Sequence, residues 1–223
     1  MVEIAGEMDN RRGHRGPALL AAARDLFFDQ GYAGTTMAQV AERAGLSKRA
    51  TYLYFKNKDE LFITVASEGL EILQGWLEEL DIENDSLESL IRQTMDTYLR
   101  FATDRADYFR IIFSEASAEM IANVPEALRV RVAQQERDCL AVVARIVEKG
   151  LAEGALPPSD PWEMAVIYWG TCTGILLLSF GASQTIVGQQ VREELISKAV
   201  WILYRGSTLD PPDASRRPWS EEG

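Results

Sequence analysis

Apolar residues recur every three or four positions along most of the chain, which is the spacing of helices that bury one face. Such stripes run through residues 19–27, 37–44, 61–80 and 87–101, among others. No stretch shows the sustained two-residue alternation that is typical of a strand. The pattern therefore predicts an all-α fold of about nine helices.

Turn and capping residues predict where the first helices begin and end. Pro17 suits the first position of a helix, and Gly31 is placed to end it. Thr36 followed three residues later by Gln39 forms a capping box at the start of a second helix, which Gly45 ends.

A third short helix is expected to begin after Ser47, which can cap it, and to reach about Phe55. Asn57 with Glu60 forms a second capping box, which opens a long helix. Three short helices separated by glycine stops predict a helix-turn-helix head, residues 15–60.

The helices after the head are longer, and they form the predicted body of the protein, residues 61–206. Within the body, Asp160 is placed to cap a helix that has Pro161 in its first position. A flexible basic arm, residues 1–14, precedes the head, and a polar, proline-rich tail, residues 207–223, is expected to be disordered.

One uncharged stretch, from Met164 to Val191, is long enough to suggest a membrane span. However, it contains several Thr and Ser residues, and no Lys or Arg flanks it closely to set a topology. We therefore expect a helix that is buried in a core or a subunit interface, and no membrane partner.

Charge is unevenly distributed along the chain. The formal net charge is -11, yet residues 10–58 hold nine Lys or Arg and only three acidic residues. A basic head on an acidic body predicts that the head binds a polyanion.

The residues that usually support catalysis or metal binding are scarce. Cys139 and Cys172 both lie in apolar helical surroundings, and the single histidine, His14, is distant from both in the sequence. There is no nucleophile elbow or phosphate loop, and the paired carboxylates Glu78–Glu79 and Glu193–Glu194 suit solvated helix faces. We expect no enzyme activity, catalytic residue, metal or cofactor.

The predicted location is the cytoplasm. The N-terminal stretch has no apolar run of the secretory type, and the two cysteines suit the small core residues of a reducing compartment.

The segment "GLSKRATYLYFKNKDELF", residues 45–62, has the composition of a DNA-reading helix. With Leu46, Thr51 and Phe55 inward, its outer face carries Lys48, Arg49, Ala50, Tyr52, Leu53 and Tyr54. Cationic side chains can reach guanine O6 and N7, and apolar ones can contact a thymine methyl group. A second interpretation makes the two tyrosines core residues and the lysines solvated surface.

The longer motif "TTMAQVAERAGLSKRATYLYFKNKDELF" resembles the DNA-binding signature of the tetracycline-repressor (TetR) family, over about residues 19–62. The resemblance implies a DNA-binding set that consists of Thr36, Ser47, Lys48, Arg49, Ala50, Tyr52, Leu53, Tyr54 and Lys58. Of these, it places Thr36, Tyr52, Tyr54 and Lys58 at or beside the DNA backbone, and Lys48, Arg49, Ala50 and Leu53 facing the bases.

The chain departs from the family pattern at Thr51, where an apolar residue is usual, and at Ala50 and Leu53, where polar residues are frequent. An operator sequence therefore cannot be transferred from a relative. The arginines of the arm, Arg11, Arg12 and Arg15, suit either a minor-groove contact or a solvated tail.

The resemblance also implies a homodimer that pairs through its last two long helices. The dimer residues expected from this are Gly170, Gly174, Leu178, Leu195 and Ile202. A two-fold dimer would place its two reading helices about 34–36 Å apart, on a pseudo-palindromic double-stranded operator.

A small apolar or aromatic effector is expected to bind inside the body and to release a repressor from its operator. The candidate pocket residues are Trp76, Tyr98, Phe101, Phe109, Phe113, Tyr168, Trp169 and Cys172. Ordinary core packing is a competing interpretation for each of them. A helical apolar-ligand-binding or adaptor protein with a non-functional head is the alternative for the whole chain.

Overall fold

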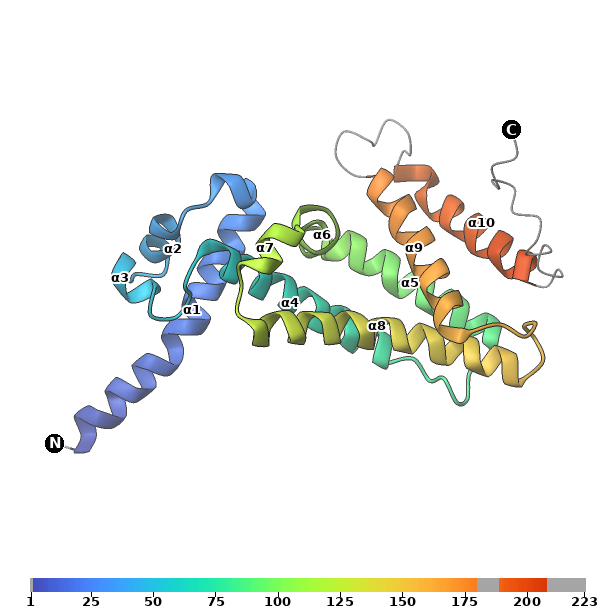
Figure 1. The fold of residues 1–223 in the computed structure, drawn as a ribbon, viewed down its shortest axis with the longest axis horizontal. Coiled ribbons are helices and arrows are strands. Elements are labelled where there is room, and N and C mark those ends of the chain that lie inside the picture. Colours follow the sequence, from blue (N-terminus) through green and yellow to red (C-terminus); the bar gives the residue numbers. More distant parts are fainter. Residues whose placement is uncertain (1, 180–188, 208–223) are drawn as a thin grey trace. The chain divides into compact units, whose positions relative to one another are not determined.

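The computed structural model describes residues 2–179 and 189–207, with side chains for 15–113, 116–179 and 192–204 (Figure 1). Within these ranges every regular element is a helix, which confirms the predicted all-α fold. The elements are α1 (Val2–Gly34), α2 (Met37–Arg43), α3 (Lys48–Thr51), α4 (Lys58–Glu78), α5 (Leu87–Asp104), α6 (Ala106–Arg110), the π-helix η1 (Ile111–Glu115), α7 (Ala118–Ala122), α8 (Glu126–Ala152), α9 (Pro161–Leu178) and α10 (Gln189–Ser207). The predicted tail lies outside the described residues from residue 208 onward.

The uncharged stretch forms most of α9 and the first residues of α10, and residues 180–188 between them lie outside the described residues. Among the helices that the structure describes, none combines the length and apolar character needed to cross a bilayer.

Helix α1 begins well before the proline that we expected at its first position. The backbone is helical from Val2, and Pro17 lies inside the helix, so the predicted arm is helical in the structure. Gly31 does interrupt the helix as predicted, with a φ of 71° that favours glycine. Gly16 does not adopt a positive φ, so it does not end the helix.

The capping box of α2 is present as predicted. Thr36 Oγ1 accepts from the backbone N–H of Gln39, whose side-chain oxygen in turn accepts from the backbone N–H of Thr36 at 2.8 Å. The second capping box differs from the prediction. Asn57 caps α4, but the Glu60 carboxylate accepts from the backbone N–H of Lys56 rather than that of Asn57.

Helix α3 is shorter than predicted. Ser47 caps it, but it ends at Thr51 instead of reaching Phe55. The N–H groups of Leu53 and Tyr54 donate to carbonyl groups three residues back, at 3.2 and 3.0 Å, so tight turns replace the last helical turn.

The chain divides into two compact units, and both draw on α4, α5 and α8. Unit 1 comprises residues 1–75 and 100–137, and unit 2 comprises residues 76–99 and 138–223. The first unit therefore contains the predicted head together with most of α4, all of α6 and α7, and the beginning of α8.

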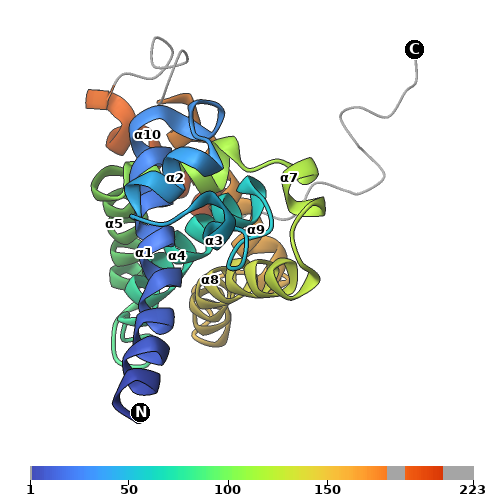
Figure 2. The same ribbon diagram turned by 90° about the vertical axis from the view of Figure 1, so that its left-hand side faces the viewer.

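Aromatic side chains form the centre of unit 1, where α1 lies beside the start of α4 (Figures 1 and 2). The rings of Phe27 and Phe62 meet edge to face with centroids 5.0 Å apart, and both side chains are fully buried. Phe28 on α1 meets Tyr108 on α6 in the same geometry. Such contacts favour a fixed arrangement of the three helices.

A ladder of polar contacts joins α4 to the beginning of α8 within unit 1. The buried Ser67 hydroxyl donates to Gln135 Oε1 at 2.8 Å, and Gln135 Nε2 donates to Glu71 Oε1 at 3.1 Å. Arg131 pairs with the same Glu71 carboxylate at 2.8 Å. These directional bonds fix the register of α8 along α4.

Unit 2 is built from α5, the later part of α8, α9 and α10, and α9 packs against α10. Its core contains Leu87 and Leu90 from α5, Ile146 and Val147 from α8, and Leu156 from the connection to α9. A Cβ atom on Gly150 would lie 2.8 Å from both Leu156 Cδ1 and Leu87 Cδ2, so glycine is required for this packing.

Candidate functional site: a basic reading surface and an apolar cavity

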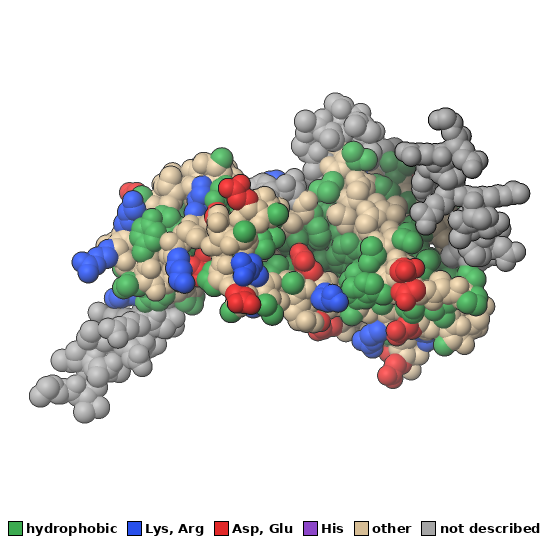
Figure 3. Space-filling model, viewed as in Figure 1, with side chains coloured by type: hydrophobic (Ala, Val, Ile, Leu, Met, Phe, Trp, Pro, Cys, Tyr) green, Lys and Arg blue, Asp and Glu red, His purple; other side chains and the backbone are tan. Residues whose placement is uncertain are grey.

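The surface over α3 combines cationic and apolar side chains. Lys48 and Arg49 are exposed, as are Leu53, at 82%, and the ring of Tyr52, at 45%. Figure 3 shows Lys and Arg side chains projecting from the face that carries α2 and α3. Because the exposed leucine in the turn after α3 contributes little to the core, this surface suits contact with a partner.

The opposite side of α3 holds it against the rest of unit 1. Thr51 is fully buried, while Leu46, Ala50 and Phe55 are partly buried. The Thr51 hydroxyl donates to the carbonyl oxygen of Ser47 at 3.3 Å. This bond satisfies the polar group that stands where an apolar residue is usual.

Three further residues of the predicted DNA-binding set have structural contacts of their own. The hydroxyl oxygens of Thr36 and Ser47 accept from N–H groups at the starts of α2 and α3. Tyr54 is partly buried, and its ring lies close to the backbone of Gly16, where an added Cβ would be 3.6 Å from Tyr54 Cδ1.

Lys58 is turned toward the corner between α1 and α2. Its ammonium group donates to the carbonyl oxygens of Tyr32 and Thr35 at 2.7 and 2.9 Å, and lies 3.8 Å from the centroid of the Tyr32 ring. Burial lowers the pKa of Lys58, and the neighbouring Asp59 opposes that shift. The side chain thus joins the start of α4 to the end of α1.

Asp59 extends this junction to α7. One carboxylate oxygen accepts from the Tyr32 hydroxyl, and the other accepts from Asn123 Nδ2 at 3.0 Å. Asn57 Nδ2 donates to the carbonyl oxygen of Asn123 at 3.1 Å. Burial, followed by the bond to Asp59, raises the pKa of Tyr32 to about 12. These contacts join the start of α4 to the end of α1 and to the end of α7.

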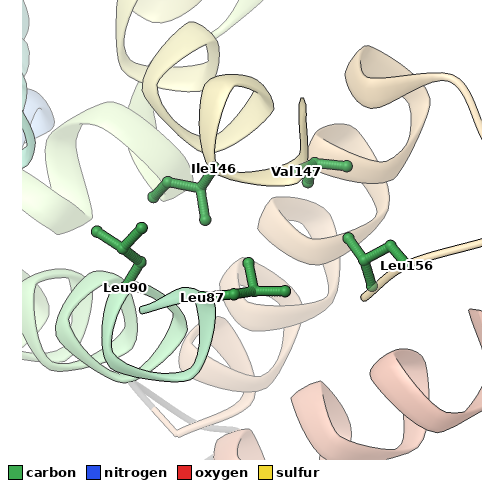
Figure 4. Packing of buried hydrophobic residues seen from close by; sticks show 5 residues of the cluster. All are labelled: Leu87, Leu90, Ile146, Val147 and Leu156. Atoms are coloured by element: carbon green, nitrogen blue, oxygen red, sulfur yellow. The ribbon is translucent and has the colours of Figure 1, made fainter. Parts of the chain in front are cut away.

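A separate cavity of about 80 Å³ lies inside unit 2. Its thirteen lining residues come from α5, α8, α9, α10 and the connection before α9: Leu87, Ile91, Thr94, Met95, Tyr98, Val143, Ile146, Val147, Leu156, Tyr168, Trp169, Cys172 and Val200. Figure 4 shows Leu87 on α5, Ile146 and Val147 on α8, and Leu156, which form part of this lining.

The structure brings four of the eight predicted pocket residues to this cavity, namely Tyr98, Tyr168, Trp169 and Cys172. Phe101, Phe109 and Phe113 belong instead to unit 1, where Phe101 and Phe109 are buried, and Trp76 is partly buried outside the lining. The aliphatic residues of the lining were not predicted, although Leu87, Ile91 and Tyr98 form one apolar stripe in the sequence.

Tyr98 anchors the contact between α5 and α9. Its hydroxyl is 2.6 Å from Thr173 Oγ1, and its ring centroid is 4.6 Å from that of Trp169. Burial raises the pKa of the Tyr98 phenol, and it raises the pKa of the Cys172 thiol to about 11. The environment therefore favours uncharged groups.

The outer surface of α9 and α10 carries several exposed apolar side chains. Trp162, Val166, Ile167 and Leu178 on α9 are exposed, as are Leu195, Trp201 and Ile202 on α10. Gly170 and Gly174 continue the α9 surface, and an added Cβ at either position would meet nothing within 4 Å. All five predicted dimer residues belong to α9 or α10.

The fold and the basic surface over α3 together define a helix-turn-helix protein with a helical body. The family model described as "Bacterial regulatory proteins, tetR family" matches residues 19–65, and "Tetracyclin repressor-like, C-terminal domain" matches residues 84–177. The chain belongs to the tetracycline-repressor family of transcriptional regulators.

Similar proteins include the transcriptional activator FasR of Mycolicibacterium smegmatis, 30% identical over 133 residues, which cover 56% of this chain and 59% of FasR. That match thus covers less than two thirds of the relative. The regulator RutR of Escherichia coli K12 is 26% identical over 172 residues, covering 76% of this chain and 77% of RutR.

Among solved structures, the TetR-family repressor FadR of Thermus thermophilus, in complex with lauroyl-CoA, shares the fold with a TM-score of 0.63. It is 17% identical, and the match covers 89% of this chain and 98% of FadR.

Proposed function

We propose that this protein is a dimeric repressor that binds a pseudo-palindromic operator and releases it when an apolar effector occupies the cavity of unit 2. The carrying observation is the surface over α3, where Lys48 and Arg49 project beside the exposed side chain of Leu53. Cations supply attraction to phosphate and hydrogen bonds to guanine, while the apolar groups suit thymine methyl contacts.

The scaffold under this surface supports a reading role. Both helices of the motif begin with a side-chain cap, and Thr51 is tied to the capping residue Ser47. A fixed backbone allows a few side chains to meet base edges in a defined register. We therefore assign base contacts to the exposed Lys48, Arg49 and Leu53, and backbone contacts to Thr36, Ser47, Tyr52, Tyr54 and Lys58.

The apolar surface of α9 and α10 supports dimerisation. Exposed Trp, Ile and Leu side chains on adjoining helices lose unfavourable contact with water when a second copy covers them. Gly170 and Gly174 would allow the partner's helix to approach closely. A two-fold axis at this surface would present two copies of α3 to successive turns of the same DNA face.

The cavity supports a response to an effector. At about 80 Å³ it is well below the volume of roughly 300–1,000 Å³ that is usual for ligand sites, so binding requires the lining helices to separate. A ligand that binds only an opened form shifts the population toward that form. The complex of Thermus thermophilus FadR with lauroyl-CoA supports an acyl chain as the first effector to test.

DNA binding tests the proposal directly. We expect the protein to bind a duplex from the intergenic region upstream of its own gene, with an affinity that falls steeply as salt rises. Arg49→Ala should weaken binding by about 1–3 kcal/mol because it removes a base contact. Fluorescence anisotropy of a labelled duplex measures both effects.

Arg92→Ala is the matched control, because Arg92 is an exposed arginine on α5, outside the head. It should leave DNA affinity unchanged. If wild type ignores the upstream duplex at low salt, and also selects no sequence from a random duplex library, the alternative of an adaptor with a non-functional head is correct.

A further inference from the structure

The residues that line the cavity of unit 2 indicate which charge its ligand can have. None of the thirteen described lining residues is Lys, Arg, His, Asp or Glu. The lining offers only the hydroxyl groups of Thr94, Tyr98 and Tyr168 and the indole N–H of Trp169 as conventional hydrogen-bonding side-chain groups. We propose that the effector of this cavity is an uncharged ligand, and that the cavity excludes a ligand with an ionised carboxylate, phosphate or ammonium group.

Two of the three hydroxyl groups in the lining are bonded to uncharged groups of the protein. Thr94 Oγ1 donates to the carbonyl oxygen of Leu90 at 2.7 Å, and the Tyr98 hydroxyl pairs with Thr173. An ion in this space would lose its hydration without meeting an opposite charge, which costs several kcal/mol. A neutral alcohol, ester, ketone or hydrocarbon avoids that cost.

Two cations on the lining helices are bonded to other groups, and the buried Arg192 of α10 is not among the lining residues. Lys149, next to Gly150 on α8, donates to the carbonyl oxygen of Glu83 at 3.1 Å and pairs with Glu153. On α5, Arg92 is exposed and pairs with Glu88. Both interactions lie outside the lining, so these cations are not positioned to accept a buried anion.

Closure of the cavity by aliphatic groups strengthens the exclusion. Leu87 and Leu156 both pack so closely on Gly150 that there is no room for a Cβ atom at that position. Opening the cavity therefore replaces contacts between aliphatic side chains with contacts to the ligand. An apolar chain restores these dispersion contacts, whereas a hydrated ion does not.

This inference rests on the proposed function in one respect only, namely that the ligand is called an effector. The binding preference itself is measured without DNA. Three probes share one chain length and differ in charge at neutral pH: 1-decanol, decanoate and decylammonium. We expect 1-decanol to bind at least about tenfold more tightly than either ion, as measured by isothermal titration calorimetry.

Two variants locate the site. Ile91→Trp fills the cavity and should abolish 1-decanol binding, whereas Val130→Trp, at an exposed position on α8 in unit 1, should not. Thermal melts of both variants establish that they are folded. Should Ile91→Trp unfold, Thr94→Trp replaces it as the blocking variant.

Met95→Lys places a cation in the lining and should shift the preference toward decanoate by at least about tenfold. Equal or tighter binding of decanoate or decylammonium to wild type, lost in the blocking variant, would overturn the proposal. So would the absence of 1-decanol binding. Failure of DNA binding alone would leave the charge preference intact and would remove the proposed function instead.

Discussion

Lys58 shows how a residue of a DNA-binding motif can have a structural role first. Its ammonium group is bonded to two carbonyl oxygens at the corner after Gly31, and it lies over the Tyr32 ring. The motif alone suggested a phosphate contact at this position. The structure adds that the same ammonium group fixes the start of α4 to the end of α1, close to the cap of α2.

We predict that Lys58→Ala lowers the free energy of unfolding by about 1–3 kcal/mol, because the two partly buried carbonyl groups of Tyr32 and Thr35 lose a charged donor. Urea denaturation followed by circular dichroism measures this loss. Lys56→Ala is the control, since Lys56 is exposed and only its backbone N–H donates to Glu60. Equal stability of the two variants would show that Lys58 does not hold the corner.

At the scale of elements, close approach between helices depends on single glycines. A Cβ atom on Gly69 of α4 would lie 2.8 Å from Tyr108 Cδ1 and 2.9 Å from Ile112 Cδ1. Gly75, two turns later in the same helix, has open space at the corresponding position. A side chain is therefore excluded by close packing at Gly69 and has free space at Gly75.

Gly69→Ala should destabilise the protein by about 1–3 kcal/mol through overpacking against α6 and η1. Gly75→Ala should stabilise it by about 0.4–1 kcal/mol, because alanine restricts the unfolded chain and favours the helix. Differential scanning calorimetry of the pair gives opposite shifts in Tm. Shifts of the same sign would contradict the predicted packing at Gly69.

The sequence predicted most elements because local signals determine them. Thr36 with Gln39 and Asp160 with Glu163 are short-range capping pairs, and both are present. The predicted end of α3 and the predicted partner of Glu60 were wrong, because both depend on how the chain turns from Thr51 to Lys58. Phe101 and Tyr98 lie three residues apart, yet belong to different units, and no periodicity distinguishes them.

For the whole molecule, the exposed apolar surface of α9 and α10 should decide the oligomeric state. Val166→Glu places a charge at the centre of the proposed interface, where Val166 is 47% exposed in the single chain. We expect the dimer to dissociate at least about tenfold more readily, because burying an unpaired charge is costly. Light scattering coupled to size-exclusion chromatography reports the mass.

Val130→Glu supplies the matched control, since Val130 on α8 is 62% exposed and lies outside this surface. It should leave the mass unchanged. A dimer that survives Val166→Glu, or one that Val130→Glu dissociates, would place the interface elsewhere.

The discontinuous boundary of unit 1 has a consequence for recombination with relatives. A crossover near residue 60 would separate α3 and the start of α4 from residues 100–137, which complete the same compact unit. The new sequence would meet Tyr108 and Asn123 as foreign neighbours, because these residues contact Phe28 and Asp59. A relative that acquires the DNA-binding head of this protein therefore needs residues 1–75 and 100–137 together. A single contiguous gene fragment that ends near residue 60 would not transfer a complete unit.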